Sequence, residues 1–176
     1  MADTIRTLAE LNTMLADNTA GDIDAQDLRD MMVSLMCHAE IGSTGQVQEV
    51  LAAGWQAVKL DQAGAFQRGF TLDAPNMKIT GTPVDMKVIV SCEVVFRGTL
   101  DEDFEITVFK NPDGTPAQID RLNRTLTGLG TTRQAASWET GIALSAGDEL
   151  QMAVRSSGSD WKLDFGRLAV RRIGVE

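Results

Sequence analysis

Apolar residues recur at helical spacing near the start of the chain and at every second position further along it. The segment from residue 4 to residue 15 has apolar positions three or four residues apart, at Ile5, Leu8, Leu11, Met14 and Leu15. This spacing predicts a helix that ends near Asp17 and Asn18, with Gly21 just beyond it as a breaker.

A second helix is predicted to begin at Asp24. The Asp24 carboxylate can accept hydrogen bonds from the free amides of a first helical turn, and Asp27 stands where a capping box places its acid. Ile23 and Leu28 have the spacing of a hydrophobic staple. The apolar stripe that follows consists of Leu28, Met31, Met32, Leu35 and Met36.

Neither stripe can be hidden by its own helix. Isolated helices shorter than about 12–15 residues are marginal in water, so each stripe needs a partner surface. Two interpretations remain open: a helical hairpin within one chain, or a segment that anchors the chain to other subunits. For the second interpretation the candidate contacts are Leu28, Met31, Met32 and Leu35.

Beyond a plausible hinge at residues 42–45 the apolar period changes to two. The longest alternating run extends from Val88 to Phe96. Shorter alternating runs follow it at 104–109, 150–155, 161–165 and 168–170. Further short strands are predicted at 55–60, 66–72, 77–80 and 136–144. In the run from 161 to 165, Trp161, Leu163 and Phe165 are expected on one face, opposite Lys162 and Asp164.

Seven or eight alternating strands with no helix between them predict an antiparallel sandwich. The expected fold class is therefore mainly β: a jelly-roll β-sandwich over residues 46–176, preceded by a short N-terminal helical segment over residues 1–45. Arg167, Arg171 and Arg172 form a small basic group that favours a solvated strand edge.

Some outward positions of the strands are apolar. Ile89 and Val95 lie on the outer face of the longest run, and Phe109 lies on the run that follows it. If the three come together, they form the kind of patch that marks a subunit interface.

Charge excludes several partners. The formal net charge is -9, and both nucleic acid and anionic membranes require a positive field. No stretch approaches the roughly 18 apolar residues of a membrane-spanning helix, and residues 1–6 lack the pattern of a signal peptide. We therefore expect no nucleic-acid or membrane partner, and synthesis in the cytoplasm.

Few residues suit catalysis or metal binding. The only histidine, His38, follows Cys37 directly, and neighbours on a helix point apart. Asp17, Asn18, Asp22 and Asp24 do not match a calcium-binding loop. We expect no enzyme, cofactor or metal, and buried free thiols at Cys37 and Cys92 in preference to a disulfide.

The N-terminal segment resembles a short module that recurs in tailed-phage structural proteins. The residues that carry this resemblance are the Asp-Asn-Thr-x-Gly-x-Ile turn at 17–23 and the Gln-Asp-Leu-Arg-Asp helix start at 26–30. The rest is similar to the trimeric jelly rolls of the C1q and tumour-necrosis-factor type, through the Leu-x-x-Gly-Asp turn at 144–148 and the closing strand at 165–170.

These resemblances imply a non-enzymatic virion protein that forms a homotrimer. The first expectation is a capsid decoration (cement) protein bound to the major capsid protein of a phage head. The alternative is a head-fibre or tail-fibre protein that binds a host glycan or surface protein, with Trp55 and Trp138 as candidates if they are exposed.

Overall fold

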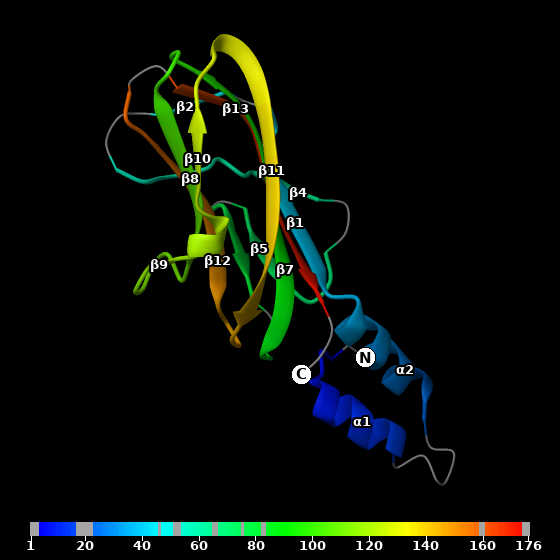
Figure 1. Ribbon diagram of the computed structural model, residues 1–176. Helices are drawn as coiled ribbons and strands as arrows, with labels where there is room; N and C mark the ends of the chain where they lie inside the picture. Colours follow the sequence, from blue (N-terminus) through cyan, green and yellow to red (C-terminus); the bar gives the residue numbers. More distant parts are fainter. Residues whose placement is uncertain are drawn as a thin grey trace.

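The computed structural model describes residues 4–16, 23–45, 47–50, 54–64, 67–74, 76–81, 84–158 and 161–173, without the side chains of Leu8, Leu15, Ala16, Val33 and Leu35. In these residues an antiparallel two-sheet sandwich follows two short helices (Figure 1). The expected fold class, a mainly β sandwich with a helical start, is confirmed.

No strand of the described residues belongs to both sheets. Sheet A has the order β11 (Gly130–Leu144), β7 (Met86–Gly98), β13 (Trp161–Arg172), β1 (His38–Gly42) and β4 (Gln62–Ala63), and β2 (Gln48–Val50) also pairs with β13. Sheet B has the order β10 (Arg124–Thr127), β8 (Asp103–Lys110), β12 (Glu149–Ser156), β6 (Lys78–Thr80) and β5 (Thr71–Asp73), with β3 (Gln56–Ala57) on β12 and β9 (Ala117–Gln118) on β8. A 3-10 turn at Asp120–Leu122 precedes β10.

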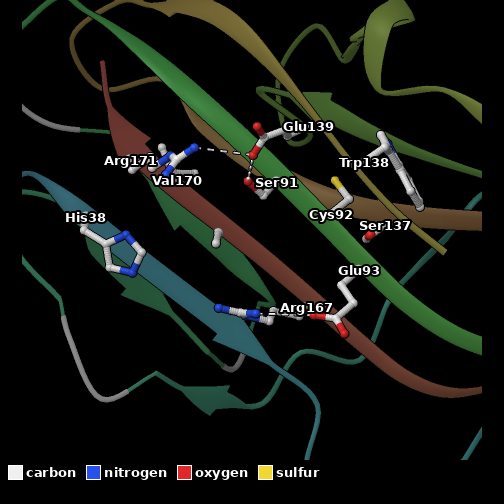
Figure 2. A pocket seen from close by; sticks show the side chains of 11 residues that line it. His38, Ser91, Cys92, Glu93, Ser137, Trp138, Glu139, Arg167, Val170 and Arg171 are labelled. Atoms are coloured by element: carbon white, nitrogen blue, oxygen red, sulfur yellow. Dashed lines mark hydrogen bonds and ion pairs between the residues drawn. The ribbon is translucent and has the colours of Figure 1, made fainter. Parts of the chain in front are cut away.

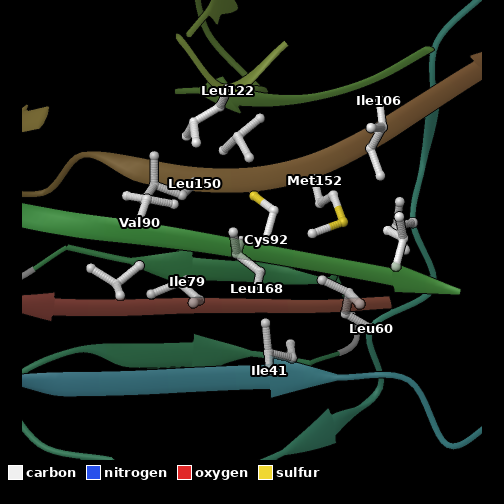
Figure 3. Packing of buried hydrophobic residues seen from close by; sticks show 14 of the residues in the cluster. Ile41, Leu60, Ile79, Val90, Cys92, Ile106, Leu122, Leu150, Met152 and Leu168 are labelled. Carbon is white, nitrogen blue, oxygen red and sulfur yellow. The ribbon is translucent and has the colours of Figure 1, made fainter. Parts of the chain in front are cut away.

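The core lies between the sheets and follows the predicted alternation. Every second residue of β7 from Met86 to Gly98 is buried, because successive side chains of a strand point to opposite faces. Figure 3 shows Cys92 and Leu168 of sheet A in the same buried layer as Met152 of sheet B. Phe96, Phe104 and Trp161 stack at one end of the core, with ring centroids 4.8–5.7 Å apart.

Both expected helices are present, as α1 (Leu8–Ala16) and α2 (Ala25–Leu35). The Asp24 carboxylate accepts from the amides of Gln26 (2.6 Å) and Asp27 (2.8 Å), and Asp27 accepts in return from the Asp24 amide (3.2 Å). The predicted capping box is therefore confirmed. Residues 17–22, which carry most of the phage-like turn, lie outside the described residues.

Polar contacts hold the helices to one end of the sandwich (Figure 1). Asp30 is only 1% exposed; it accepts from the Thr4 amide at 2.8 Å and pairs with Arg6 at 2.8 Å. Ser34 accepts from the Arg6 amide through its hydroxyl (2.7 Å) and from Arg172 of β13 through its carbonyl (2.5 Å). One side of α2 is thus fixed to the end of a central strand.

The sandwich begins earlier than expected. Residues 38–42, assigned to the helical segment by sequence, form β1 between β13 and β4. Ala39 and Ile41 are fully buried while their neighbours are half-buried, so this short strand alternates like the others. Its polar residues and small size conceal the pattern in the sequence.

The alternation predicted for residues 161–165 is wrong at its end. The register of β13 on β7 shifts between Leu163 and Phe165, which makes Asp164 an extra residue in the strand. Trp161 and Leu163 face the core as expected, but Phe165 pairs with Val95 and faces outward. The basic group is also misplaced by sequence, because β13 is a central strand and Arg172 is buried.

The predicted Gly-Asp turn organises the end of the sandwich between β11 and β12. Asp148 accepts from the Ser145 amide (2.6 Å), from Asn111 (2.9 Å) and from Lys110 (2.5 Å). Asn111 adopts a left-handed conformation with φ of 53°, and its side-chain oxygen accepts from the Glu149 amide. One aspartate therefore joins the β11–β12 turn to the end of β8.

Cys37 and Cys92 are both buried free thiols, as predicted. Burial raises the pKa of Cys92 to about 12 and also raises the pKa of Cys37. Neither thiol is therefore ionised or reactive at neutral pH. Among the described residues, no helix has the length and apolar character needed to cross a membrane.

Replacing Asp30 with Asn should loosen the attachment of the helices. The amide cannot replace the ion pair with Arg6 in a buried setting, so we expect a loss of about 1–3 kcal/mol in unfolding free energy. Urea denaturation followed by circular dichroism measures the loss. The exposed carboxylate of Glu49, whose nearest base is Lys162 at 3.9 Å, supplies the control: Glu49→Gln should change stability by less than about 0.5 kcal/mol. Equal effects would contradict the attachment.

Stability should fall in acid. The hydrogen bond from the Thr4 amide lowers the pKa of Asp30. Burial alone would raise the pKa of Asp148, but hydrogen bonds from Lys110, Asn111 and Ser145 outweigh burial, so the pKa of Asp148 is also lowered. Both carboxyls thus contribute stability above the unfolded aspartate pKa of about 3.9, which is lost as pH falls through their lower folded pKa values. The urea concentration at the unfolding midpoint, measured from pH 7 to pH 3, should decrease once the pH is below about 4. The decrease should be smaller in Asp148→Asn, which lacks one of the two carboxyls. A flat profile would contradict this assignment.

Candidate assembly surface

The outer face of sheet A is formed by alternate residues of β11, β7, β13 and β1. The register places Ser137 and Arg167 on either side of Glu93, and two residues further along β7 it places Phe165 beside Val95. An apolar row therefore adjoins a polar row on this face.

Ion pairs join the strands across this face. Arg167 contacts Glu40 of β1 at 2.6 Å and Glu93 of β7 at 3.3 Å, so one guanidinium connects three strands. Arg171 lies 3.5 Å from Glu139 of β11. The hydrogen bond to Glu40 raises the pKa of Arg167 despite partial burial. The sequence pattern predicts the arginines only as a basic group; it does not reveal their glutamate partners, because these come from distant segments.

Bulges bring a further charged cluster to the far end of the face. Asp164, the extra residue of β13, is 8% exposed and lies 3.2 Å from Arg97 and 3.0 Å from Arg133. Arg133 falls in the stretch of β11 where its register on β7 also shifts. Lys162 stands directly across from Arg97, and such like-charged pairs destabilise a sheet unless a carboxylate intervenes. Asp164 supplies that carboxylate.

This face is close to neutral, whereas the whole chain carries a net charge of -9. Its charged residues comprise the acids Glu40, Glu49, Glu93, Glu139 and Asp164 and the bases Lys87, Arg97, Arg133, Lys162, Arg167 and Arg171. The acidic excess therefore lies on the other surfaces.

A shallow hollow of about 420 Å³ lies over the ion pairs. Figure 2 shows Arg167 directed toward Glu93 on one side of the hollow and Arg171 toward Glu139 on the other. Ser91 donates to Glu139 at 3.1 Å, so that carboxylate has a second partner. The charged groups that line the hollow are thus paired with one another, an arrangement that suits contact with a protein surface better than acid–base chemistry.

Ile89 and Val95, two of the predicted interface residues, lie half-buried on this face. Phe109 does not lie with them: it belongs to β8 of sheet B, where it packs edge-on against Trp55 with centroids 5.5 Å apart. The expected joint patch is therefore wrong, because the chain crosses to the other sheet after β7. The outward apolar neighbour of Val95 is Phe165.

The predicted helix contacts occupy different environments. Leu28 and Met32 of α2 are exposed, and Met31 is half-buried in the gap between α1 and α2, near Leu11 and Met14. The side chain of Leu35 lies outside the described residues. The structure thus contains a helical hairpin, and it also leaves part of the stripe on α2 uncovered.

Neither candidate tryptophan for glycan binding is fully exposed. Arg155 stacks on the ring of Trp55 at 4.6 Å, so the ring is already covered on one side. Trp138 packs partly against the core and donates to the Leu122 carbonyl at 3.2 Å.

The described residues contain no group of three or more His, Cys, Asp or Glu side chains that could hold a metal ion. His38 begins β1, and its backbone amide and carbonyl pair with Arg68 at 2.8 and 2.7 Å. Asp17, Asn18 and Asp22, members of the acidic cluster near Gly21, lie outside the described residues.

Solved structures of the same fold are available for comparison. Eiger TNF from S. frugiperda matches with a TM-score of 0.62 at 13% identity, over 80% of this chain and 94% of that one. The fold is a TNF-like jelly roll. Murine APRIL matches with TM-scores of 0.52 at pH 5.0 and 0.53 at pH 8.5, at 8% and 10% identity, over 77% of this chain and 99% of APRIL in each case. No protein-family model matches the sequence, and neither does any curated protein.

Removing Asp164 should destabilise this TNF-like sandwich. Asp164→Ala leaves Arg97, Arg133 and Lys162 close together without their buried carboxylate, so we expect a loss of about 2–4 kcal/mol in unfolding free energy. Thermal and urea denaturation measure the loss. The exposed partner provides the comparison, since Arg133→Gln should cost no more than about 1 kcal/mol. A loss for Arg133→Gln as large as that for Asp164→Ala would be inconsistent with the cluster.

Proposed function

We propose that this chain is a non-enzymatic structural protein of a tailed-phage virion. In this proposal it forms a homotrimer through the outer face of sheet A and decorates the phage head as a cement protein. The observation that carries the proposal is the near-neutral, internally paired face of sheet A in a chain with a net charge of -9.

Electrostatics favour this face for self-association. Copies of a strongly acidic protein repel one another through most of their surfaces, and the repulsion is weakest where acids and bases balance. Charged groups that are already paired within the chain cost less free energy to cover than unpaired charges do. Val95 and Phe165 add an apolar row to the same face, which supports burial against another copy.

The helical end supports attachment to a larger shell. The segment that resembles the tailed-phage module includes the helix start at 26–30, and that start is a capped helix in this chain. A trimer would present three such ends to the major capsid protein, so several weak contacts would act together. Leu28, Met31, Met32 and Leu35 remain the proposed contacts to the capsid or to neighbouring subunits, with Ile89 and Val95 in sandwich contacts; Phe109 is not among them, because it belongs to sheet B.

Receptor binding by a fibre protein is the weaker candidate. A glycan site needs aromatic faces and polar groups presented together. The rings of Trp55 and Trp138 are each partly covered by their own chain, by Arg155 in the first case and by the core in the second.

The trimer is tested by placing a charge on the face of sheet A. Light scattering of the purified chain should give the mass of three copies. Val95→Asp should raise the dissociation midpoint, the protein concentration at which half of the trimer has dissociated, at least about tenfold, because the new carboxylate would be buried at the contact. Thr125→Asp adds the same charge on an exposed position of β10 and should leave the mass unchanged. A monomeric wild-type chain would refute the trimer.

Location on the head is tested separately. Antibody-gold labelling of purified phage particles, viewed by negative-stain microscopy, should decorate heads. Labelling confined to tails would refute the cement role and leave the fibre interpretation.

A further inference from the structure

α2 exposes an apolar stripe that α1 does not have. Leu28 and Met32 of α2 and the C-cap residue Met36 follow one another at intervals of four residues and are 47%, 52% and 58% exposed. On α1, the described exposed side chains are Ala9, Glu10, Asn12 and Thr13, a mainly polar set typical of a helix that faces water. The two helices of one hairpin therefore differ in what they present to the outside.

The stripe cannot turn inward in the observed structure. Asp30 and Ser34, on another side of α2, are almost completely buried and hold it to Thr4, Arg6 and Arg172. Rotation of α2 to hide Met32 would break these contacts and expose a paired buried carboxylate. Any cover for the stripe must therefore come from another molecule.

The stripe continues into the face of sheet A. Met32 and Met36 line a hollow of about 430 Å³ together with His38 and Arg68. His38 also lines the hollow over the ion pairs of sheet A (Figure 2). A surface that covers one of these regions thus reaches the edge of the other.

Charge selects the kind of partner. Beyond the Asp24 cap, the only charged residue among the exposed described side chains of α2 is Arg29. Asp27 is half-buried in the capping box and Asp30 is buried against Arg6, so the exposed side of this helix carries little of the negative charge that keeps copies of the chain apart. In a trimer with threefold symmetry, residues beside the axis meet the same residues of the other two copies. Methionine suits such a contact, because its flexible side chain adapts to an irregular neighbour.

We propose that the α2 stripes of three copies pack against one another around the trimer axis, so that the helices extend the contact made by sheet A. This inference rests on the proposed trimer and adds a second, helical contact to it. The occupant of the stripe is a further copy of this chain, and the capsid is left to contact other parts of the helical end.

A charge on the stripe tests the inference. Met32→Asp in the full-length chain should raise the dissociation midpoint concentration of the trimer at least about tenfold, because it buries an unpaired carboxylate. Asn12→Asp places the same charge on the exposed face of α1 and should leave the midpoint unchanged. Sedimentation equilibrium over a dilution series measures both variants.

Crosslinking supplies a readout that does not depend on stability. A short bismaleimide should link copies of Met32→Cys and should not link copies of Asn12→Cys, since Cys37 and Cys92 are buried and have raised pKa values. Each link uses two of the three thiols of a trimer, so one chain per trimer stays unlinked on a denaturing gel.

The outcomes separate this inference from the proposed function. A trimeric Met32→Asp chain with an unchanged midpoint, and no crosslinking of Met32→Cys, would overturn the helical contact while leaving the trimer intact. If that variant also fails to bind phage heads, the stripe belongs to the capsid contact. A monomeric wild-type chain would overturn both proposals.

Discussion

β13 holds the molecule together because elements from both ends of the sequence depend on it. It pairs with β7 along nearly all of its length, with β1 on its other side, and with β2 beside Trp161 to Leu163. Its residue Arg172 donates to the Ser34 carbonyl and so fixes α2. The outward positions of the same strand, from Phe165 to Arg171, supply much of the candidate assembly surface. Fold, helix attachment and surface thus rest on one strand.

Long and strongly patterned elements could be predicted from sequence, and short ones could not. The alternation in β7 and the cap at Asp24 are local signals, and the structure confirms both. β1 has only five residues, of which His38 and Glu40 are polar, so its apolar alternation is too short to identify a strand. Its place in sheet A is set by pairing with residues 167–171. Sequence predicts residues 161–165 and 168–170 as two alternating runs, and only the register shows that they form one strand with Asp164 as a bulge.

The candidate surface was partly accessible to sequence reasoning. Alternation alone places Ile89 and Val95 outside the core, which the structure confirms. Phe109 was assigned to the same patch because its strand follows in sequence, and periodicity does not show that a chain crosses between sheets. The pairs that neutralise the face join Arg167 to Glu40 and Glu93, from segments far apart in the chain, so they emerge only from the folded arrangement.

The order of the strands also determines when the proposed contact surface can exist during synthesis. β1 and β7 are made long before β13, which lies between them in sheet A, so these early strands must wait for residues 161–172 before they can join in one sheet. Distant pairings of this kind form slowly. Growing chains on neighbouring ribosomes therefore lack the face through which finished copies would associate, and the topology itself delays premature assembly.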